Sequence, residues 1–584
     1  MGNILKWFKR NDYVLIFSLL ALLTYIVLFV SRSLDDNRLT SWQWAFTDIN
    51  AVRVFFILIP GLISAYIFSR VKLIERYLAE SRRVESQPTS LRPAVCLFVS
   101  SYIIAALFWR EPEVIIDASR YFTQAKHLEI YGIGYFFREW GRDIMAWTDM
   151  PLVPFLYGLI FKFFGESRLY IQIFTTFFFS MTVVLTYMIG KTLWDEDTGL
   201  YGRMLLLGIP YLFVQVPLML VDVPTMFFLT FAIFTFIMAL KRGGSWIPLS
   251  SLAIFLAFYS KYSAWLMLSV LGVVFVVHLL SQSCQPQRKT NYFYKGSVTF
   301  LITAALIGIV FLYKHEVFLE QIRLLMSYQK PGLKRWGESF ISTFFFQIHP
   351  FITAAALYSA YAALRKKDLR YLIILWLVLL IVLFQIKRIR YIIMVFPMLS
   401  LMASYGLVQI EKKEAARFIS LCIVISSVVV GLFGYLPFMQ KINAVNLKDA
   451  GRFLDSIEES NIEVFTLSLA EPVSNPSVSV PVLDYFTKKN IIYDYENISY
   501  QPFEKIEKSS LRFTWGYKNP EYYTGNKYSK ENTAVVVISD DTNDALPEKL
   551  ERQLSGYHLS MAFNSFEGIF RYRTSVRIYQ PGRH

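Results

Sequence analysis

Two aspartates stand at the ends of apolar segments, where a carboxylate could do acid–base chemistry. Asp117 follows an apolar stretch that ends near residue 109, and Asp222 separates two such stretches. A carboxylate can accept a proton from an incoming hydroxyl or amine within hydrogen-bond reach, and one this close to hydrocarbon is a functional candidate by default. Aspartate also begins helices as a capping residue, which explains both positions equally well. The residues alone leave catalysis and capping open.

Cations occupy two short segments between apolar stretches. Lys261 and Tyr262 belong to a very short turn. The other segment holds three cations and a tyrosine within five residues: Lys387, Arg388, Arg390 and Tyr391. Arginine offers phosphate a two-pronged set of hydrogen-bond donors, while lysine is a compact point charge. Long cationic side chains also anchor helix ends at a membrane surface. That alternative explains one lysine well and three neighbouring cations poorly.

A further basic segment, 314–339, surrounds the turn signal Pro331-Gly332. It suits a mobile flap or an ordinary solvated loop, and both interpretations stay open. His349 precedes a proline at the start of an apolar stretch, and we interpret it as structural. The histidines and the three cysteines show no metal-ligand spacing, so the sequence predicts no metal site and no cofactor.

Long apolar stretches must position these residues. Of the 584 residues, 55% are hydrophobic and 18% are charged, against about 45–50% and 25% in a soluble domain. Because roughly 20 apolar residues cross a bilayer, we predict an α-helical polytopic membrane protein with about thirteen spans. The spans are expected near 12–30, 51–69, 93–109, 169–193, 200–220, 224–240, 246–260, 263–281, 297–313, 340–364, 371–386, 391–409 and 417–437.

Positive charge orients the chain. The net charge of +15 comes mainly from Lys and Arg in connections that share a side with the N-terminus. This distribution is typical of orientation in a membrane, so we exclude nucleic acid as a partner and place the N-terminus in the cytoplasm. The first apolar stretch is too long for a cleaved signal peptide. An odd number of spans puts the C-terminal region outside, together with the basic segments 314–339 and 387–390.

Two regions are predicted to lie outside the bilayer. The outer loop 111–168 begins with charged residues and is apolar over 152–164, which is typical of interfacial helices. From about residue 440 the pattern becomes that of a soluble domain, with a helix over 450–457 and short strands at 464–467, 491–495 and 535–538. We therefore expect three parts: two extra helices over 1–92, a membrane catalytic domain over 93–439 and a small α/β domain over 440–584. Asn497-Ile498-Ser499 fits a glycosylation acceptor.

The acids and the cations share the outer side of the predicted membrane. Cations there could hold a phosphate, while a carboxylate activates a nucleophile that arrives at it. A lipid-linked phosphate suits such a site, because its tail can stay in the bilayer.

These motifs resemble the GT-C superfamily of membrane glycosyltransferases, and within it the branch of protein O-mannosyltransferases and aminoarabinose transferases. The resemblance covers roughly 93–410. It is carried by segments in a fixed order: Asp117 with Arg120-Tyr121 and Ala125-Lys126, Asp149 to Tyr157, Phe164 to Arg168, Leu193-Trp194-Asp195, Asp222-Val-Pro224, Lys261-Tyr262, and Lys387 to Tyr391 with Pro397.

The resemblance implies a GT-C fold with an extracytoplasmic C-terminal domain and assigns roles to these residues. Asp117 is the implied catalytic carboxylate, and Asp222 is the second acidic position. The implied substrate-binding residues are Arg120, Tyr121, Asp149, Lys261, Tyr262, Lys387, Arg388, Arg390 and Tyr391, of which Lys261, Arg390 and Tyr391 lie near the donor phosphate. Members of the branch usually have Asp-Glu where this chain has Asp117-Ala118, so Glu113 or Asp149 could replace the missing acid. The branch generally uses no metal.

We therefore predict an inverting enzyme that moves a sugar from a polyprenyl-phosphate donor to a lipid, glycan or protein acceptor outside the cytoplasm. A transporter or flippase of lipid-linked sugars is the alternative, and it predicts charges near the bilayer midplane and broken helices from internal repeats. A scaffold that binds polysaccharide is a third possibility, which leaves the outer acids and cations unexplained.

Overall fold

A computed structural model describes most of the chain. It covers residues 12–35, 45–46, 50–70, 92–110, 113, 115–147, 149–281, 286–329, 338–437, 445–467, 475–493, 514–515, 519–524, 532–539, 546–564 and 574–582. The predicted turn at Pro331-Gly332, the glycosylation acceptor at Asn497 and the basic connection over 71–91 lie outside these residues.

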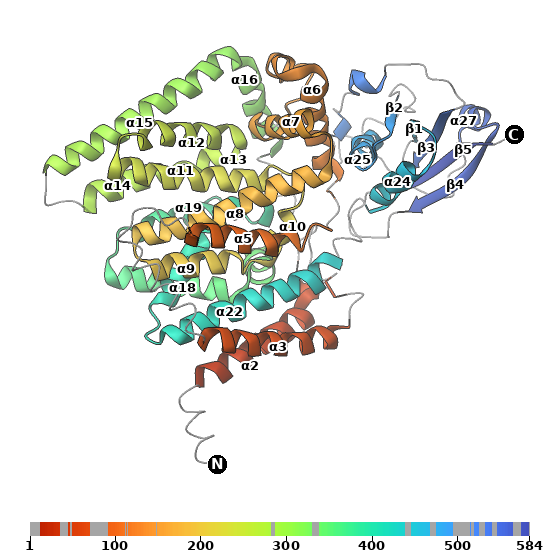
Figure 1. The fold of residues 1–584 in the computed structure, drawn as a ribbon. Coiled ribbons are helices and arrows are strands. Elements are labelled where there is room, and N and C mark those ends of the chain that lie inside the picture. Colours follow the sequence, from red (N-terminus) through yellow and green to blue (C-terminus); the bar gives the residue numbers. More distant parts are fainter. Residues whose placement is uncertain are drawn as a thin grey trace.

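Apolar helices make up the larger part of the molecule (Figure 1). Among the described residues, eight are long and apolar enough to cross a membrane: Asp12–Leu34, Ala51–Arg70, Arg168–Leu193, Asp222–Arg242, Ser263–Leu280, Lys289–Tyr313, Ile389–Val408 and Lys413–Tyr435. Shorter apolar helices occur at Ala94–Ala106, Leu152–Phe164, Trp246–Ser260 and Tyr371–Leu383. The chain is a multi-pass membrane protein, whereas the total of about thirteen spans stays a prediction.

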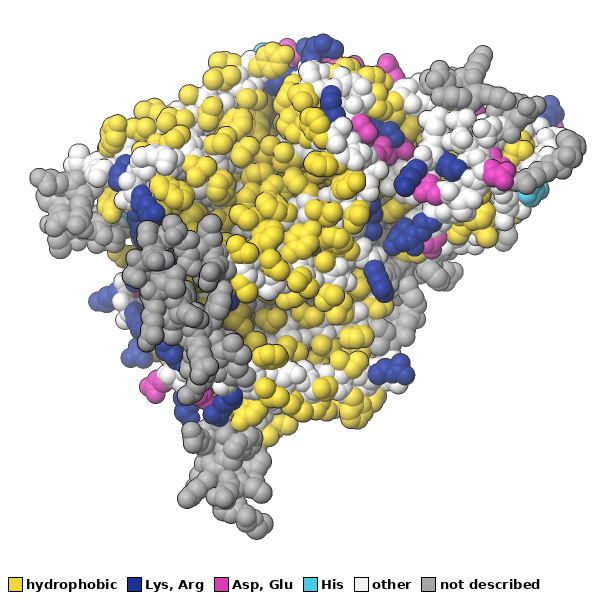
Figure 2. All heavy atoms as spheres, viewed as in Figure 1, with side chains coloured by type: hydrophobic (Ala, Val, Ile, Leu, Met, Phe, Trp, Pro, Cys, Tyr) yellow, Lys and Arg dark blue, Asp and Glu magenta, His cyan; other side chains and the backbone are white. Residues whose placement is uncertain are grey.

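The helical body places some helices inside and leaves others at its edge. Its helices are α2 (Asp12–Val30), α3 (Ala51–Arg70), α5 (Arg92–Ala106), α8 (Arg168–Leu193), α9 (Glu196–Leu206), α10 (Pro210–Gln215), α11 (Asp222–Arg242), α12 (Trp246–Ser260), α13 (Ser263–Met267), α14 (Val270–Ser281), α15 (Pro286–Tyr313), α16 (His315–Leu324), α18 (Pro350–Lys366), α19 (Tyr371–Leu383), α20 (Ile389–Ile392), α21 (Phe396–Val408) and α22 (Lys413–Val430). The apolar stretch of α11 is 94% buried and those of α2 and α15 only 17%. Figure 2 shows that hydrophobic side chains cover much of the visible surface of this helical body.

Some predicted spans are not continuous helices, for example 263–281, which is divided between α13 and α14. The stretch 200–220 is divided between α9 and α10, because Pro210 has no backbone N–H to donate into the preceding turn. The stretch 340–364 contains a π-helical segment, Ser342–Ile348, followed by a break at His349 before α18 begins. The segment after residue 314, expected to be a loop or flap, begins instead as helix α16.

The segment before α8 contains two helices, where its composition predicted interfacial helices without fixing their number. They are α6 (Ile115–Glu139) and α7 (Leu152–Phe164), and α6 bends at Gly132, whose φ of 87° suits a residue without a Cβ. The Tyr157 hydroxyl of α7 donates a hydrogen bond to the Leu220 carbonyl at 2.6 Å. This bond fixes the pair of helices over the segment that leads into α11.

The C-terminal residues form a small α/β domain, as predicted. Its strands are β1 (Asn461–Thr466), β2 (Asn490–Tyr493), β3 (Thr533–Ser539), β4 (Tyr557–Asn564) and β5 (Ser575–Pro581), in the order β2-β1-β3-β5-β4. β1 is parallel to β2 and β3, while β5 is antiparallel to β3 and β4. The helices α24 (Val445–Ser456), α25 (Ser479–Tyr485) and α27 (Glu548–Gln553) complete it. Every residue of β3 is buried, so β3 is the centre of the domain's core.

Candidate active site

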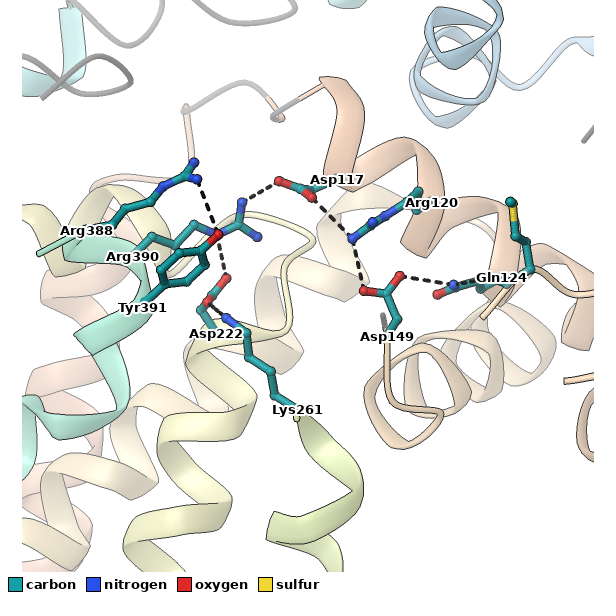
Figure 3. A network of polar contacts seen from close by, with 10 residues as sticks. Asp117, Arg120, Gln124, Asp149, Asp222, Lys261, Arg388, Arg390 and Tyr391 are labelled. Carbon is teal, nitrogen blue, oxygen red and sulfur yellow. Dashed lines mark hydrogen bonds and ion pairs between the residues drawn. The ribbon is translucent and has the colours of Figure 1, made fainter. Parts of the chain in front are cut away.

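Chain segments far apart in the sequence end at one place in the helical body (Figure 3). Asp117 and Arg120 lie in the first turns of α6, and Asp149 stands just before α7. Asp222 is the first residue of α11, and Lys261 directly follows α12. Arg390 and Tyr391 come from the short helix α20. Each charged group therefore sits at or near the end of a helix.

Arg390 joins the two aspartates. Its Nε donates to Asp222 Oδ2 at 2.9 Å, and its Nη1 donates to Asp117 Oδ2. Lys261 Nζ donates to the other oxygen of Asp222, Oδ1, at 2.5 Å. Both oxygens of Asp222 are thus bound by cations, and the guanidinium of Arg390 is shared between two carboxylates.

The same pattern continues through Arg120. Its Nη2 lies 3.4 Å from Asp117 Oδ1 and 2.9 Å from Asp149 Oδ1. Cations and carboxylates therefore alternate along a continuous charged row made of Lys261, Asp222, Arg390, Asp117, Arg120 and Asp149. An alternating arrangement lets the low-dielectric surroundings strengthen each attraction while no charge is left alone.

Burial differs along the charged row. The side chain of Asp222 is 1% exposed and that of Asp149 is 6% exposed, while Asp117 reaches 21%. Asp117 is thus the carboxylate of the row that an incoming molecule can reach most easily. Asp222, by contrast, is placed to hold Lys261 and Arg390 in position.

The carboxylates of Asp117 and Asp149 differ in proton affinity. Burial alone would raise the pKa of Asp117, but the Arg390 and Arg120 guanidiniums outweigh it and hold the pKa below its ordinary value. Burial raises the pKa of Asp149 and the Arg120 guanidinium lowers it. The effect of burial is the larger one, so the pKa of Asp149 lies above its ordinary value. Asp117 is therefore fully ionised at neutral pH.

Tyr391 lies between cations. The Arg388 guanidinium is 5.1 Å from the centroid of the Tyr391 ring, and Lys261 Nζ is 5.5 Å from the same centroid. Both distances suit a cation–π contact. Arg388 Nη1 also lies 3.4 Å from the Tyr391 hydroxyl, a long hydrogen bond.

The remaining predicted residues lie beside the charged row. Tyr121 is 2% exposed and packs in an apolar cluster with Phe122 and Tyr157. Tyr262 packs beside Tyr259. Lys387 lies 5.8 Å from the ring centroid of Phe340. Glu113, the possible substitute acid, is fully buried and bound to Arg168 and to the Met219 backbone N–H, so it fastens the loop and lies outside the charged row.

Sequence reasoning missed two glutamines that hold Asp149. Gln124 Nε2 donates to Asp149 Oδ2 at 3.3 Å and to the Met145 carbonyl at 2.9 Å. Gln321 Nε2 donates to the Asp149 carbonyl at 2.5 Å. Gln124 follows Asp117 by two helical turns, so helical spacing could have placed it on the same face. Gln321 comes from α16 and carries no such signal.

The small domain is joined to α6 by a buried ion pair that the sequence did not indicate. Asp484 of α25 accepts hydrogen bonds from Lys126 Nζ and from the Tyr523 hydroxyl, each at 2.6 Å. Glu166 Oε2 lies 3.1 Å from the same lysine. Burial, with the nearby Asp484 carboxylate, raises the pKa of Glu166 to about 8. Two acids thus share one ammonium, and the domain is held against the helix that carries Asp117.

Within the described part of the chain, no three His, Cys, Asp or Glu side chains gather closely enough to hold a metal ion.

Comparisons with known proteins agree with the motif resemblance. Residues 149–310 match the family described as dolichyl-phosphate-mannose-protein mannosyltransferase. Among solved structures, ArnT from Cupriavidus metallidurans bound to undecaprenyl phosphate has a TM-score of 0.50 at 12% identity, over 84% of this chain and 98% of that one. The Archaeoglobus fulgidus oligosaccharyltransferase has a TM-score of 0.46 at 12% identity, over 78% and 70%. A search of curated protein sequences found no match.

The match and the ArnT likeness confirm the resemblance to GT-C glycosyltransferases. The matched segment contains Asp149, Asp222 and Lys261. At 12% identity, the likeness to ArnT shows the fold alone.

Proposed function

We propose that this chain is a membrane glycosyltransferase that moves a sugar from a polyprenyl-phosphate donor to an acceptor outside the cytoplasm. The observation that carries the proposal is the position of Arg390, whose guanidinium is shared by Asp117 in the first turn of α6 and Asp222 at the start of α11. A guanidinium so placed can pass from a carboxylate to a phosphate, since both accept the same pair of hydrogen bonds. The undecaprenyl phosphate in the ArnT structure supports a phosphate-linked lipid as the ligand of this fold.

The charged row suggests how the reaction proceeds. An arriving donor phosphate competes with Asp117 for Arg390. Burial already favours the protonated form of Asp117, so its pKa rises when Arg390 turns to the phosphate. Asp117 thereby becomes a better base when the donor is bound. It takes the proton of the acceptor hydroxyl or amine as that group attacks the anomeric carbon from the face opposite the phosphate.

Cations then stabilise the leaving group. The bond between the anomeric carbon and the phosphate oxygen breaks, and its electron pair leaves with the polyprenyl phosphate. We expect this charge to develop beside Arg390 and Lys261, and such stabilisation is usually the largest catalytic contribution. Asp222 acts as a positioning residue, because it binds both cations and is 1% exposed. Attack from the opposite face inverts the anomeric configuration.

The transporter alternative receives less support from the geometry. A transporter predicts a binding site near the bilayer midplane. The charged row instead lies at the start of α11, the end of α12 and the start of α20.

The proposed orientation has the N-terminus in the cytoplasm and the small domain outside, and it can be tested by labelling. In a background without native cysteines, single cysteines at Glu320 and Lys549 should react with an impermeant thiol reagent from outside, while one at Lys367 should not. All three positions are exposed in the structure. Labelling of position 367 with protection of the other two would reverse the orientation and place the charged row in the cytoplasm.

The proposed activity is tested with purified protein and a panel of polyprenyl-phosphate-linked sugars. We expect at least one donor to release free polyprenyl phosphate, which mass spectrometry detects. Movement of intact donor between the leaflets of a vesicle, without release of polyprenyl phosphate from any donor of the panel, would support the transporter instead.

A further inference from the structure

A cavity lies between α6 and the small domain, next to the charged row. It measures about 190 Å³, and its lining includes Arg120, Gln124 and Tyr131 of α6, Trp147, and Asn519 and Glu521 of the small domain. Arg120 and Gln124 both bind Asp149, so the wall of the cavity is also part of the charged row. Figure 3 shows these two side chains reaching Asp149 from the same helix.

Two residues in the cavity wall, Gln124 and Asn519, have a side-chain oxygen without a hydrogen-bond partner among the described residues. Gln124 is 3% exposed, and its Oε1 is buried with no hydrogen-bond partner among the described residues. Its Nε2 is fixed by two acceptors, Met145 O and Asp149 Oδ2, so the amide orientation is settled. Asn519 repeats the pattern, because its Nδ2 donates to the Tyr493 carbonyl while its Oδ1 is buried without a partner among the same residues.

His127 adds a third acceptor to the same wall. Its Nδ1 lies 2.7 Å from the Thr123 carbonyl, which can only accept, so Nδ1 carries the proton. Burial lowers the pKa of His127, which keeps the ring neutral at neutral pH and leaves Nε2 as an acceptor. Asp143 and Glu521, both exposed, bring carboxylates to the same cavity. Arg120, the cation of the lining, is already paired with Asp117 and Asp149. The ligand that fits such a lining therefore carries several donors and no net negative charge.

Aromatic rings form the apolar part of the cavity. Tyr131 and Tyr135 have ring centroids 4.7 Å apart, and His127 stacks on Tyr135 at an interplanar angle of 4°. Trp147 also lines the cavity, with φ at 47°, a backbone conformation that is uncommon for a bulky residue. Flat rings beside hydrogen-bond acceptors suit a sugar ring, which has apolar C–H faces and hydroxyl donors around its edge.

We propose that this cavity binds the acceptor and that the acceptor presents a pyranose unit there. The cavity is smaller than the roughly 300–1,000 Å³ of pockets for drug-sized ligands, which favours a single sugar ring. That the bound sugar is the acceptor rests on the proposed glycosyl transfer. Binding of a pyranose in this cavity does not depend on that activity. It gives the small domain a role, because Asn519 and Glu521 complete the wall that α6 begins.

Ligand-observed NMR on the full-length protein in nanodiscs tests the site without any donor. The probes are the methyl glycosides of glucose, galactose and mannose, with a capped Ala-Ser-Ala peptide as the rival ligand. We expect saturable binding of at least one glycoside. Tyr131→Ala should weaken it about tenfold through loss of the ring contact, while Tyr131→Phe should retain it. Tyr170→Ala is the matched control, because Tyr170 is also 38% exposed but lies on α8.

Each outcome decides the proposal. Binding of the peptide alone, no binding of any glycoside, or equal binding by wild type and Tyr131→Ala would overturn it. Glu521→Ala provides a second variant on the small domain and should also weaken glycoside binding. If wild-type protein binds the glycoside but uses no donor, the transfer proposal fails and the pyranose site stands.

Discussion

Asp117→Asn should reduce turnover by on the order of 10²–10⁴-fold while leaving a folded protein that still binds the donor. Asparagine has nearly the same shape and caps helices about as well as aspartate. It cannot take a proton at neutral pH, so the general base is removed while the helix start is preserved. Turnover should be measured at saturating donor, with folding checked by thermal melting.

The other carboxylates near Asp117 provide the controls for this experiment. Asp149→Asn and Glu113→Gln test whether another acid replaces the glutamate that is missing at position 118. Glu113 is bound to Arg168 and Met219, so its variant should mainly lower the melting temperature. Full activity of Asp117→Asn with an inactive, folded Asp149→Asn would move the base to Asp149. Full activity of all three would contradict the proposed site.

Arg390→Ala should weaken donor use by roughly ten- to a hundredfold, because a hydrogen bond to a charged group contributes about 1.5–3 kcal/mol. Arg390→Lys should recover part of the loss, since lysine keeps the charge but cannot bind two acceptors as a fork. Steady-state kinetics with varied donor measures both. Arg323→Ala is the control, because that side chain is 80% exposed. Unchanged donor use in both Arg390 variants would leave the arginine as a structural partner of Asp117 and Asp222.

The Arg390 variants should also change the pH dependence. Burial raises the pKa of Asp117, and Arg390 is the foremost group that opposes it. Without Arg390 the pKa should rise, so the acidic limb of kcat/KM should move to higher pH. Breaking a buried ion pair also costs about 3–5 kcal/mol of stability, which is why thermal melting must accompany the kinetics. An acidic limb that stays in place would show that Asp117 is not the titrating base.

The sequence allowed the members of the charged row to be predicted, but not their pairing. Asp117, Asp222, Lys261 and Arg390 could be grouped because each stands at an end of an apolar segment on one predicted side of the membrane. The sharing of Arg390 between two carboxylates could not be predicted, because Arg390 and Asp117 are separated by 273 positions. Their contact depends on how α6, α11 and α20 pack. The sequence therefore suggested that Lys261 and Arg390 are unpaired and available to bind phosphate, whereas in the structure both are paired with aspartates.

The fold, too, could be predicted from the sequence only in part. Long apolar runs such as 222–242 predict helices well, because a membrane-spanning helix is the usual structure of so many apolar residues in a row. The break between α9 and α10 was missed although Pro210 marks it in the sequence, because the residues on both sides of the proline are apolar and the run was interpreted as one span. In the small domain, β4 was missed because most of its residues are exposed, so it lacks an apolar run. The cavity beside Gln124 and Asn519 needs two domains and left no local signal.

The central claim is that the acceptor displaces polyprenyl phosphate from the anomeric carbon in a single step at the charged row. The anomeric configuration of the product tests this claim most directly. A donor of known configuration should yield polyprenyl phosphate and glycosylated acceptor in equal amounts, and NMR of the product gives the configuration of the new bond. We predict inversion, since Asp117 takes the acceptor proton and forms no bond to the sugar. A product with retained configuration, or a sugar found covalently attached to Asp117, would contradict the mechanism.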